Sequence, residues 1–160
     1  MSIAKGDKLP AGKLVKLGEN GPEPVETAEL AQGRVVIFAV PGAYTPTCNN
    51  AHMPSFVKNA DQIRAKGVSR IVCVTVNDPF VAGAWARDTG ATGAGIEVLA
   101  DADGSFTKAL GLDIQADGWV NGRSKRYGMV VQDGVVETLE IEESPSTCAI
   151  SSGDSLLGLL

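Results

Sequence analysis

The chain has 160 residues, of which 44% are hydrophobic and 21% are charged, and its formal net charge is −5. This length and balance are typical of one globular domain with a sizeable core. The negative charge provides no basic surface for nucleic acid or anionic membrane, and no apolar run reaches the roughly 18 residues of a membrane-spanning helix.

The first part of the chain predicts a strand, a turn and a buried strand. Lys13–Leu17 alternates between polar and apolar residues and predicts an edge strand, and Gly18–Pro24 is a turn by composition. Val25–Gly33 predicts a short strand and one helical turn closed by a glycine. Arg34–Val40 is an almost continuous run of apolar, largely β-branched residues, which is typical of a strand covered on both faces.

Helices and strands alternate in the centre of the chain. The helix after Val40 carries apolar side chains at Phe56, Val57, Ala60, Ile63 and Ala65 and ends at Gly67. The next predicted elements are a buried strand at Ser69–Val76, a helix at Pro79–Gly90, a strand at Ile96–Asp101 and a short helix at Asp103–Leu112.

The C-terminal part predicts a hairpin and a last helix. Arg126–Glu143 is predicted to be a hairpin because Asp133-Gly134 lies between two apolar runs. Ser151–Leu160 is predicted to be a helix that begins at a serine or aspartate cap. The order of elements predicts a single α/β domain over residues 1–160. Its central mixed sheet has parallel strands in the middle, an antiparallel hairpin at one side and flanking helices.

Cysteine usage and the N-terminus indicate a cytoplasmic protein. The first ten residues lack the apolar core of a secretory signal, and three cysteines, an odd number, argue against a secreted disulfide framework. In a reducing compartment each cysteine is either a small core hydrophobe or a reactive group. Cys73, between β-branched residues, is interpreted as an inert core thiol.

Cys48 lies where the Arg34–Val40 strand ends and a helix begins. Sites in open α/β sheets gather beyond the carboxyl ends of the strands. The first turn of a helix offers free N–H groups and a positive dipole end, which favour the nucleophilic thiolate. A lone cysteine more often simply packs under a helix, so this placement favours reactivity without naming a reaction. The hydroxyls of Thr45 and Thr47 can bond to a sulfur or to a substrate oxygen.

Several other residues have competing interpretations. His52, the only histidine, follows Cys48 by four residues and can share its helical face, which makes a Cys–His hydrolase an alternative. No third catalytic signature accompanies that pair, so His52 is interpreted as a helix residue near the site. Phe80 and Trp85 are interpreted as core or interface residues. No pattern predicts a metal site or a dinucleotide-binding loop.

Residues 41–48, PGAYTPTC, resemble the active-site loop of the peroxiredoxins, in which a proline, a threonine and the peroxidatic cysteine occupy the places of Pro41, Thr45 and Cys48. The histidine and proline of NNAHMPSF, and the segments KGVSRIVCVTVNDPFVAGAWARDTG and KRYGMVVQDGVVETLEIE, are similar to the type-5 (type II) subfamily. The resemblance covers nearly the whole chain. It implies a thioredoxin-like fold with the additions of a peroxiredoxin.

The resemblance also implies an antioxidant enzyme, a thiol peroxidase that reduces hydrogen peroxide and alkyl hydroperoxides. The Cys48 thiolate would attack the peroxide and become a sulfenic acid, with release of water or an alcohol. Thr45 would offer its hydroxyl to the peroxide or the thiolate, and Pro41 would shield the sulfur. The alternative is a thioredoxin-fold relay or sensor protein that passes oxidation from Cys48 to a partner thiol.

An arginine is implied as the stabiliser of the thiolate and the transition state, and two candidates lie close together, Arg123 and Arg126. The arginine of the family stands directly before an aromatic residue and the hairpin. Arg126, which precedes Tyr127, fills that place. The fixed fork of an arginine can contact both a sulfur and a peroxide oxygen.

Cys148 lies in a polar stretch before the last helix, where we expect an exposed thiol. Some type-5 members have a resolving cysteine in this region, although an ungapped alignment of the last helix puts that position at Ile150. If Cys148 resolves, thioredoxin is the expected reductant; if not, glutathione and glutaredoxin are expected. The resemblance implies no cofactor beyond this external thiol, and it implies a homodimer because the subfamily commonly forms one.

Overall fold

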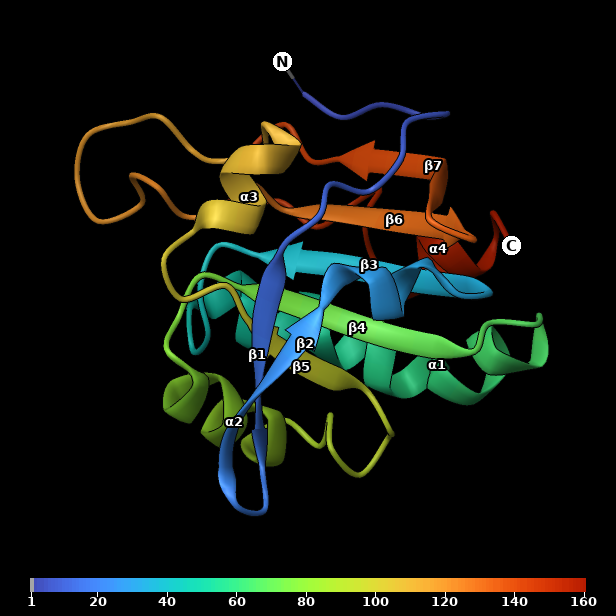
Figure 1. Cartoon of the computed structure of the whole chain (residues 1–160), viewed down its shortest axis with the longest axis horizontal. Helices are drawn as coiled ribbons and strands as arrows, with labels where there is room; N and C mark the ends of the chain where they lie inside the picture. The colour runs from blue at the N-terminus through green and yellow to red at the C-terminus, as the bar shows by residue number, and fades with distance from the viewer. Residues whose placement is uncertain (1) are drawn as a thin grey trace.

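A computed structural model describes residues 2–160, and within them a seven-stranded mixed sheet carries helices on both faces (Figure 1). The strands are β1 (Lys13–Gly18), β2 (Gly21–Glu26), β3 (Arg34–Val40), β4 (Arg70–Thr75), β5 (Glu97–Ala100), β6 (Tyr127–Gln132) and β7 (Val135–Ile141). The helices are η1 (Thr27–Ala31), η2 (Cys48–His52), α1 (Met53–Ala65), α2 (Pro79–Asp88), α3 (Ser105–Leu110) and α4 (Gly153–Leu157). None of the described helices is long and apolar enough to cross a membrane.

The strand order is β2-β1-β5-β4-β3-β6-β7. β3, β4 and β5 are parallel in the centre, and β6 and β7 form the predicted antiparallel hairpin beside β3. The edge-strand prediction for Lys13–Leu17 is wrong, because β2 covers β1 on its outer side. The turn prediction for Gly18–Pro24 is wrong over its second half, which belongs to β2. An outermost strand tolerates prolines because the missing N–H groups face no partner strand.

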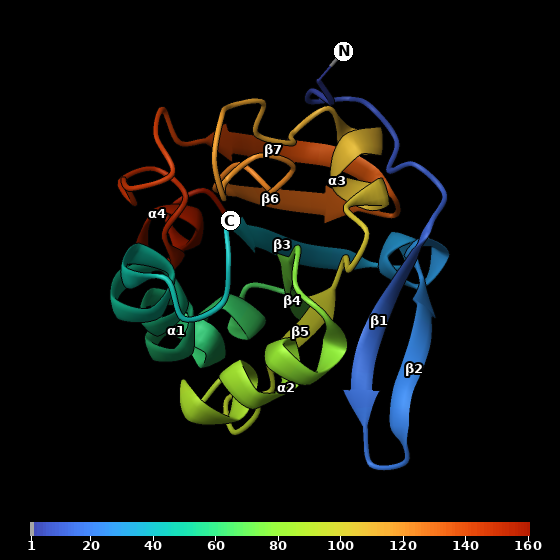
Figure 2. The ribbon, with the colours of Figure 1, turned by 90° about the vertical axis from the view of Figure 1, so that its left-hand side faces the viewer.

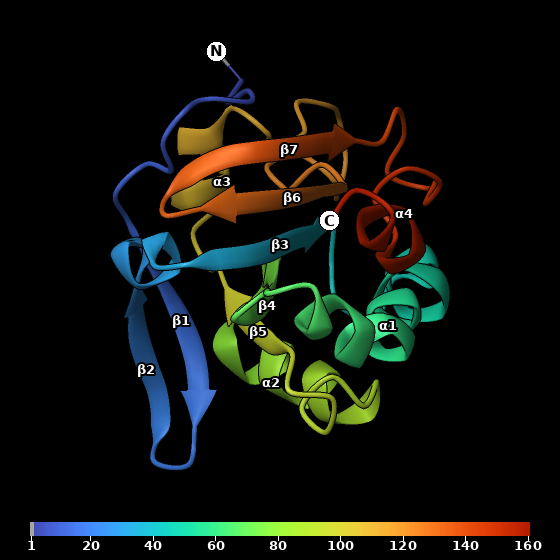
Figure 3. The ribbon, with the colours of Figure 1, turned by 90° about the vertical axis from the view of Figure 1, so that its right-hand side faces the viewer.

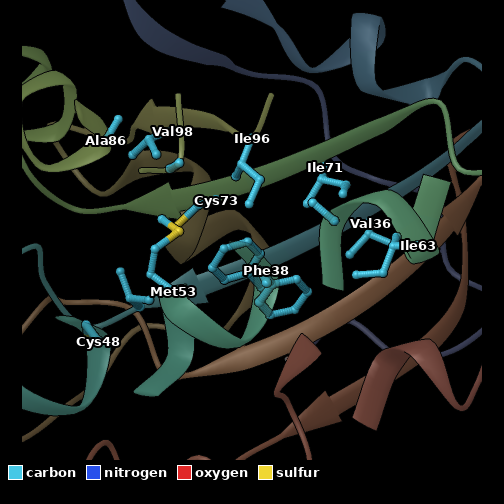
Figure 4. Packing of buried hydrophobic residues seen from close by; sticks show 14 of the residues in the cluster. Val36, Phe38, Cys48, Met53, Ile63, Ile71, Cys73, Ala86, Ile96 and Val98 are labelled. Carbon is cyan, nitrogen blue, oxygen red and sulfur yellow. The ribbon is translucent and has the colours of Figure 1, made fainter. Parts of the chain in front are cut away.

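The sheet separates two apolar cores, and β3 contributes to both because its side chains alternate between the faces. Val36, Phe38 and Val40 pack against α1, α2 and α4, whereas Val35, Ile37 and Ala39 pack on the side of η1 and α3. Figure 2 shows these helices on opposite sides of the sheet. Figure 4 shows Phe38 among the side chains of the first core. Its ring stacks on that of Phe56 with centroids 3.8 Å apart.

Helices α3 and α4 are both shorter than predicted. α3 occupies six residues of the predicted Asp103–Leu112, because Gly104 and Gly111 each adopt a left-handed conformation with φ of 73° at its two ends. α4 begins at the predicted serine cap, since the Ser152 hydroxyl accepts a hydrogen bond from the Ser155 N–H at 3.1 Å.

The segment between β3 and α1 contains a single π-helical turn. Residues Cys48–His52 form this turn, in which the Met53 N–H donates to the Cys48 carbonyl. Pro54 follows in the first turn of α1, where it has no N–H to give to a regular α-helical ladder. The wider turn brings Cys48 and His52 to the inner side of the segment, where both are fully buried.

Candidate active site

The site forms where β3 ends and β6 begins. Ala39 pairs with Tyr127 in the antiparallel register of these strands, so the residues after β3 and those before β6 are neighbours (Figure 3). Cys48 follows β3 through a short loop, and Arg126 directly precedes β6. The pairing of two strands therefore brings together a thiol and a guanidinium that lie far apart in the sequence.

Arg126 is held by three partners and is only 1% exposed. Its Nη2 donates to Cys48 Sγ at 3.0 Å, and its Nη1 lies 2.9 Å from His52 Nδ1. Nε and Nη2 both donate to the Pro145 carbonyl, at 3.1 and 2.9 Å. The Cys48 sulfur thus accepts a hydrogen bond from a buried, positively charged guanidinium.

Arg123, the other candidate arginine, lies elsewhere. Its Nη1 donates to the Val76 carbonyl at 2.6 Å, and it makes no hydrogen bond to Cys48 among the described residues. Of the two arginines, the structure therefore brings Arg126 to the sulfur.

His52 is buried beside Arg126, and both of its ring nitrogens have partners. Nε2 lies 2.9 Å from the Ser151 carbonyl, and Nδ1 faces the guanidinium. Burial, together with the positive charge of Arg126, lowers the pKa of His52 to about 3. The ring is therefore neutral at pH 7 and has no free nitrogen to take a proton from Cys48, which argues against the Cys–His hydrolase.

A small cavity of about 190 Å³ lies next to this arrangement. Its lining consists of Pro41, Thr45, Pro46, Thr47, Trp119, Val120, Arg126, Pro145 and Ser146. The Thr45 hydroxyl donates to the Gly42 carbonyl at 2.8 Å, so its oxygen lone pairs are left to accept a hydrogen bond. The Thr47 hydroxyl donates to the Ser146 carbonyl at 3.1 Å and joins the loop to the C-terminal segment. Pro41 and Thr45 thus share one cavity with Arg126.

The C-terminal segment is fastened to the site by Glu142. One carboxylate oxygen accepts hydrogen bonds from the Ala149, Ile150 and Ser151 N–H groups at 2.9, 2.9 and 2.7 Å, and from the Ser151 hydroxyl at 2.6 Å. Burial alone would raise the pKa of Glu142, but these hydrogen bonds outweigh it and lower the pKa below its usual value.

Cys148 belongs to this fastened segment, and the prediction that its thiol is exposed is wrong. The residue is of intermediate burial, because its loop folds against the site instead of extending into solvent, and the thiol is free. Burial is the main cause that raises the pKa of Cys148, and the Glu142 carboxylate adds to it, although Arg126 opposes both.

The remaining predictions concern core residues. Cys73 is fully buried in β4 as predicted, close to Met53 in the first core (Figure 4), and burial raises its pKa well above the usual value. Trp85 is also fully buried, and its indole N–H donates to Asn49 Oδ1 in the π-helical turn at 3.0 Å. Phe80 is 62% exposed, so it is not a core residue. Residues 2–160 contain no group of three His, Cys, Asp or Glu side chains arranged for a metal ion.

Sequence reasoning missed three groups that touch Arg126 or fasten its surroundings. These are the imidazole of His52, the carbonyl of Pro145 and the carboxylate of Glu142. The spacing of His52 after Cys48 was the one local signal, but it indicated a pair with the cysteine instead of a contact with the arginine. The other two contacts depend on how the C-terminal segment folds back, which no local pattern reports.

Known proteins resemble this chain both in sequence and in fold. The family model described as Redoxin matches residues 4–157. The chain is 41% identical over 161 residues to Peroxiredoxin-2C of Oryza sativa subsp. japonica, with 99% of this chain and 98% of the relative covered. It is also 41% identical to the chloroplastic Peroxiredoxin-2E-2 of the same plant, over 99% of this chain and 73% of that relative.

Among solved structures, reduced Prx3 from Vibrio vulnificus in complex with H2O2 superimposes with a TM-score of 0.92 and 44% identity, over 98% of both chains. The sheet order and flanking helices are those of the thioredoxin-like peroxiredoxin fold. By sequence and by fold, the chain belongs to the type-5 (type II) peroxiredoxins, a subfamily of thiol peroxidases.

Proposed function

We propose that the protein reduces hydrogen peroxide and alkyl hydroperoxides at Cys48, and that glutathione or glutaredoxin regenerates the oxidised cysteine. The observation that carries this proposal is the 3.0 Å contact between Arg126 Nη2 and Cys48 Sγ beside a small cavity. The cavity is large enough for a hydroperoxide. The apolar side chains of Trp119 and Val120 in its lining favour an alkyl group as well as the parent peroxide.

In the proposed reaction, the Cys48 thiolate attacks the terminal oxygen of the hydroperoxide. The S–O bond forms as the O–O bond breaks, and the hydroxyl proton of that oxygen stays with the new sulfenic acid. The electron pair of the O–O bond leaves with the second oxygen, which takes a proton from solvent and departs as water or an alcohol. The sulfur is oxidised by two electrons and the peroxide is reduced by two.

Thr45 and Arg126 have opposite hydrogen-bonding roles towards the peroxide, since Thr45 accepts and Arg126 donates. The Thr45 oxygen accepts a hydrogen bond from the hydroxyl group of the peroxide, because its own hydroxyl proton is donated to the Gly42 carbonyl. Arg126 donates N–H groups towards the oxygen on which negative charge develops, which is the form of stabilisation that a preorganised donor provides. Pro41 contributes an apolar wall that limits access of water to the sulfur.

Regeneration by an external thiol is favoured by the state of Cys148. Its raised pKa reduces the fraction of attacking thiolate, and Glu142 holds the residues just after it. We therefore propose that one glutathione condenses with the sulfenic acid to a mixed disulfide with release of water. A second thiol, from glutathione or glutaredoxin, then releases Cys48. The scheme uses no resident cofactor.

We further propose that the protein acts as a homodimer. Tyr44, Phe80 and Trp119 are 48%, 62% and 65% exposed, so their aromatic rings are accessible to a partner surface. A second copy of the chain is the proposed cover, and sedimentation equilibrium at micromolar concentration tests this. A cytoplasmic location stays a prediction.

The test of the function is intact-mass analysis after one equivalent of peroxide, followed by turnover assays with either reductant system. We expect one added oxygen on Cys48, turnover with glutathione and glutaredoxin, loss of both in Cys48→Ser, and retention of both in Cys148→Ser. A linked Cys48–Cys148 peptide would contradict the proposed reductant and favour thioredoxin. Slow peroxide reduction with stoichiometric oxidation of a partner thiol would identify a relay protein instead.

A further inference from the structure

Contacts with aromatic rings, a carbonyl and a guanidinium fix the position of the His52 imidazole. The ring of His52 lies beside the stacked rings of Phe38 and Phe56, with centroids 5.0 and 5.6 Å away. The Ser151 carbonyl at Nε2 can only accept a hydrogen bond, and the Arg126 guanidinium at Nδ1 can only donate one. The neutral tautomer with its proton on Nε2 is the one form of the ring that satisfies both contacts.

We propose that His52 is a positioning residue of the peroxidase, which orients the Arg126 guanidinium towards Cys48 by accepting a hydrogen bond on Nδ1. The inference rests on the proposed role of Arg126. Both terminal nitrogens of Arg126 are involved, because Nη1 donates to His52 and Nη2 donates to the sulfur. Among the described residues, the guanidinium has three partners, which are the Cys48 sulfur, the His52 ring and the Pro145 carbonyl. Without the imidazole, the Pro145 carbonyl would be the one remaining acceptor besides the sulfur.

The contacts continue into a closed ring that also includes the backbone of Arg126. The Ser151 carbonyl accepts a hydrogen bond from His52 Nε2. Ser151 in turn donates hydrogen bonds from its N–H and its hydroxyl to the Glu142 carboxylate, at 2.7 and 2.6 Å. The Glu142 N–H in turn donates to the Arg126 carbonyl at 2.9 Å. Hence the side chain of Arg126 and its place in the backbone are tied to the same network, and His52 is the link between the network and the guanidinium.

A role in core packing alone predicts a different result. Such a role would reduce stability when His52 is replaced but would leave the folded protein as reactive as before. A positioning role requires that the peroxide reaction of the folded protein slows. It also requires that an acceptor placed near the position of Nδ1 restores the rate.

The first test compares His52→Leu with His52→Asn in a single-turnover reaction with hydrogen peroxide. Leucine is apolar and has no acceptor, whereas the asparagine amide oxygen can accept from Arg126 near the position of Nδ1. We expect His52→Leu to react on the order of 10- to 100-fold more slowly than the native protein. We expect His52→Asn to be about tenfold faster than His52→Leu.

Two readouts separate positioning from packing. Thermal unfolding and circular dichroism establish the folded fraction, to which the rates are normalised. Reaction of Cys48 with an uncharged alkylating reagent, which needs no donor on a leaving oxygen, should slow less than reaction with peroxide. A folded His52→Leu protein with the native peroxide rate, or a His52→Asn protein as slow as His52→Leu, would overturn the proposal. If Arg126→Lys is also as fast as native, the role proposed for Arg126 fails with it.

A second measurement uses the unaltered protein and so does not depend on the stability of any variant. Because the chain contains one histidine, long-range nitrogen–proton NMR spectra of the untagged protein report on His52 alone. We expect a neutral ring with the proton on Nε2 from about pH 5 to about pH 8. A proton on Nδ1, or protonation of the ring within that range, would refute the inference.

Discussion

Arg126 Nη2 lies 3.0 Å from Cys48 Sγ, although 78 positions separate the two residues in the chain. The antiparallel pairing of β3 with β6 accounts for this proximity, since the end of one strand lies beside the start of the other. Arg126 thus directly precedes a central strand, and Cys48 lies in the π-helical turn that is reached from another central strand through a short loop. Elements of this kind hold reactive groups more rigidly than surface loops do.

The several donors of the planar Arg126 guanidinium should matter for the rate of peroxide reduction, as well as its charge. Arg126→Lys keeps a positive charge but removes the donors that serve Pro145, His52 and the sulfur together. We expect peroxide reduction to slow by about 10²-fold, the effect of losing one preorganised donor. Arg123→Lys is the matched control and should react within about threefold of the native rate, as measured by stopped-flow fluorescence. Equal losses in the two variants would contradict the assignment.

The hydroxyl of Thr45 should be required and its methyl group should not. Thr45→Ser retains an oxygen that can donate to Gly42 and accept from the peroxide, whereas Thr45→Val is similar in size and has no oxygen. We expect about 10²-fold slower peroxide reduction in Thr45→Val and a change of less than about fivefold in Thr45→Ser. The same stopped-flow assay measures both, and a fast Thr45→Val protein would exclude the proposed contact.

The buried histidine should make the fold sensitive to mild acid. The pKa of His52 is about 3 in the folded chain and 6.5 ordinarily, so between these values the unfolded chain binds the proton and the folded chain does not. The stabilisation is complete above pH 6.5 and is lost progressively as the pH falls. Between pH 6.5 and about pH 5, the free energy of unfolding should decrease by roughly 2 kcal/mol.

Urea unfolding at the two pH values measures this change. The His52→Asn protein, which has no group that titrates there, provides the control and should show a much smaller dependence. A native protein whose stability is the same at both pH values would disprove the prediction.

Glu142 should hold the segment that carries Ser151. Its folded pKa is lowered, so its contribution is present above the ordinary value of 4.5 and is lost as the pH falls below it. Glu142→Gln should reduce the free energy of unfolding by about 1–3 kcal/mol at pH 7 and accelerate amide exchange at Ala149, Ile150 and Ser151. The exposed neighbour Glu143 offers the control, since Glu143→Gln should change neither. Unaltered exchange in Glu142→Gln would show that other contacts hold the segment.

The start of α4 should tolerate no side chain. A Cβ at Gly153 would lie 3.0 Å from Phe56 Cα and closer still to the Ser55 backbone, so the two helices would have to separate. Gly153→Ala should cost about 1–3 kcal/mol and lower the melting temperature by roughly 2–4 °C per kcal/mol. At Gly158 the nearest atom to a Cβ is 3.5 Å away, so Gly158→Ala should be neutral in the same calorimetric scan.

The elements that surround the site were largely predictable because their signals are local. The apolar run of Arg34–Val40 reports burial on both faces, and Asp133-Gly134 reports a hairpin, whatever the rest of the chain does. The same local reading failed at Pro22 and Pro24. Composition there indicates a turn, but the position of β2 at the outside of the sheet allows a strand.

The primary structure alone accounts for the proposed nucleophile and its loop, because Cys48, Thr45 and Pro41 lie within eight residues and their motif specifies the family. It also indicated Arg126 through its place before the hairpin. Only the tertiary structure decided that Arg126 is held by His52 and Pro145, and that Glu142 fastens the half-buried segment of Cys148. The physical reason is that these contacts join strand ends, a π-helical turn and a C-terminal loop. Their geometry exists only after the sheet has paired and the loop has folded back over it.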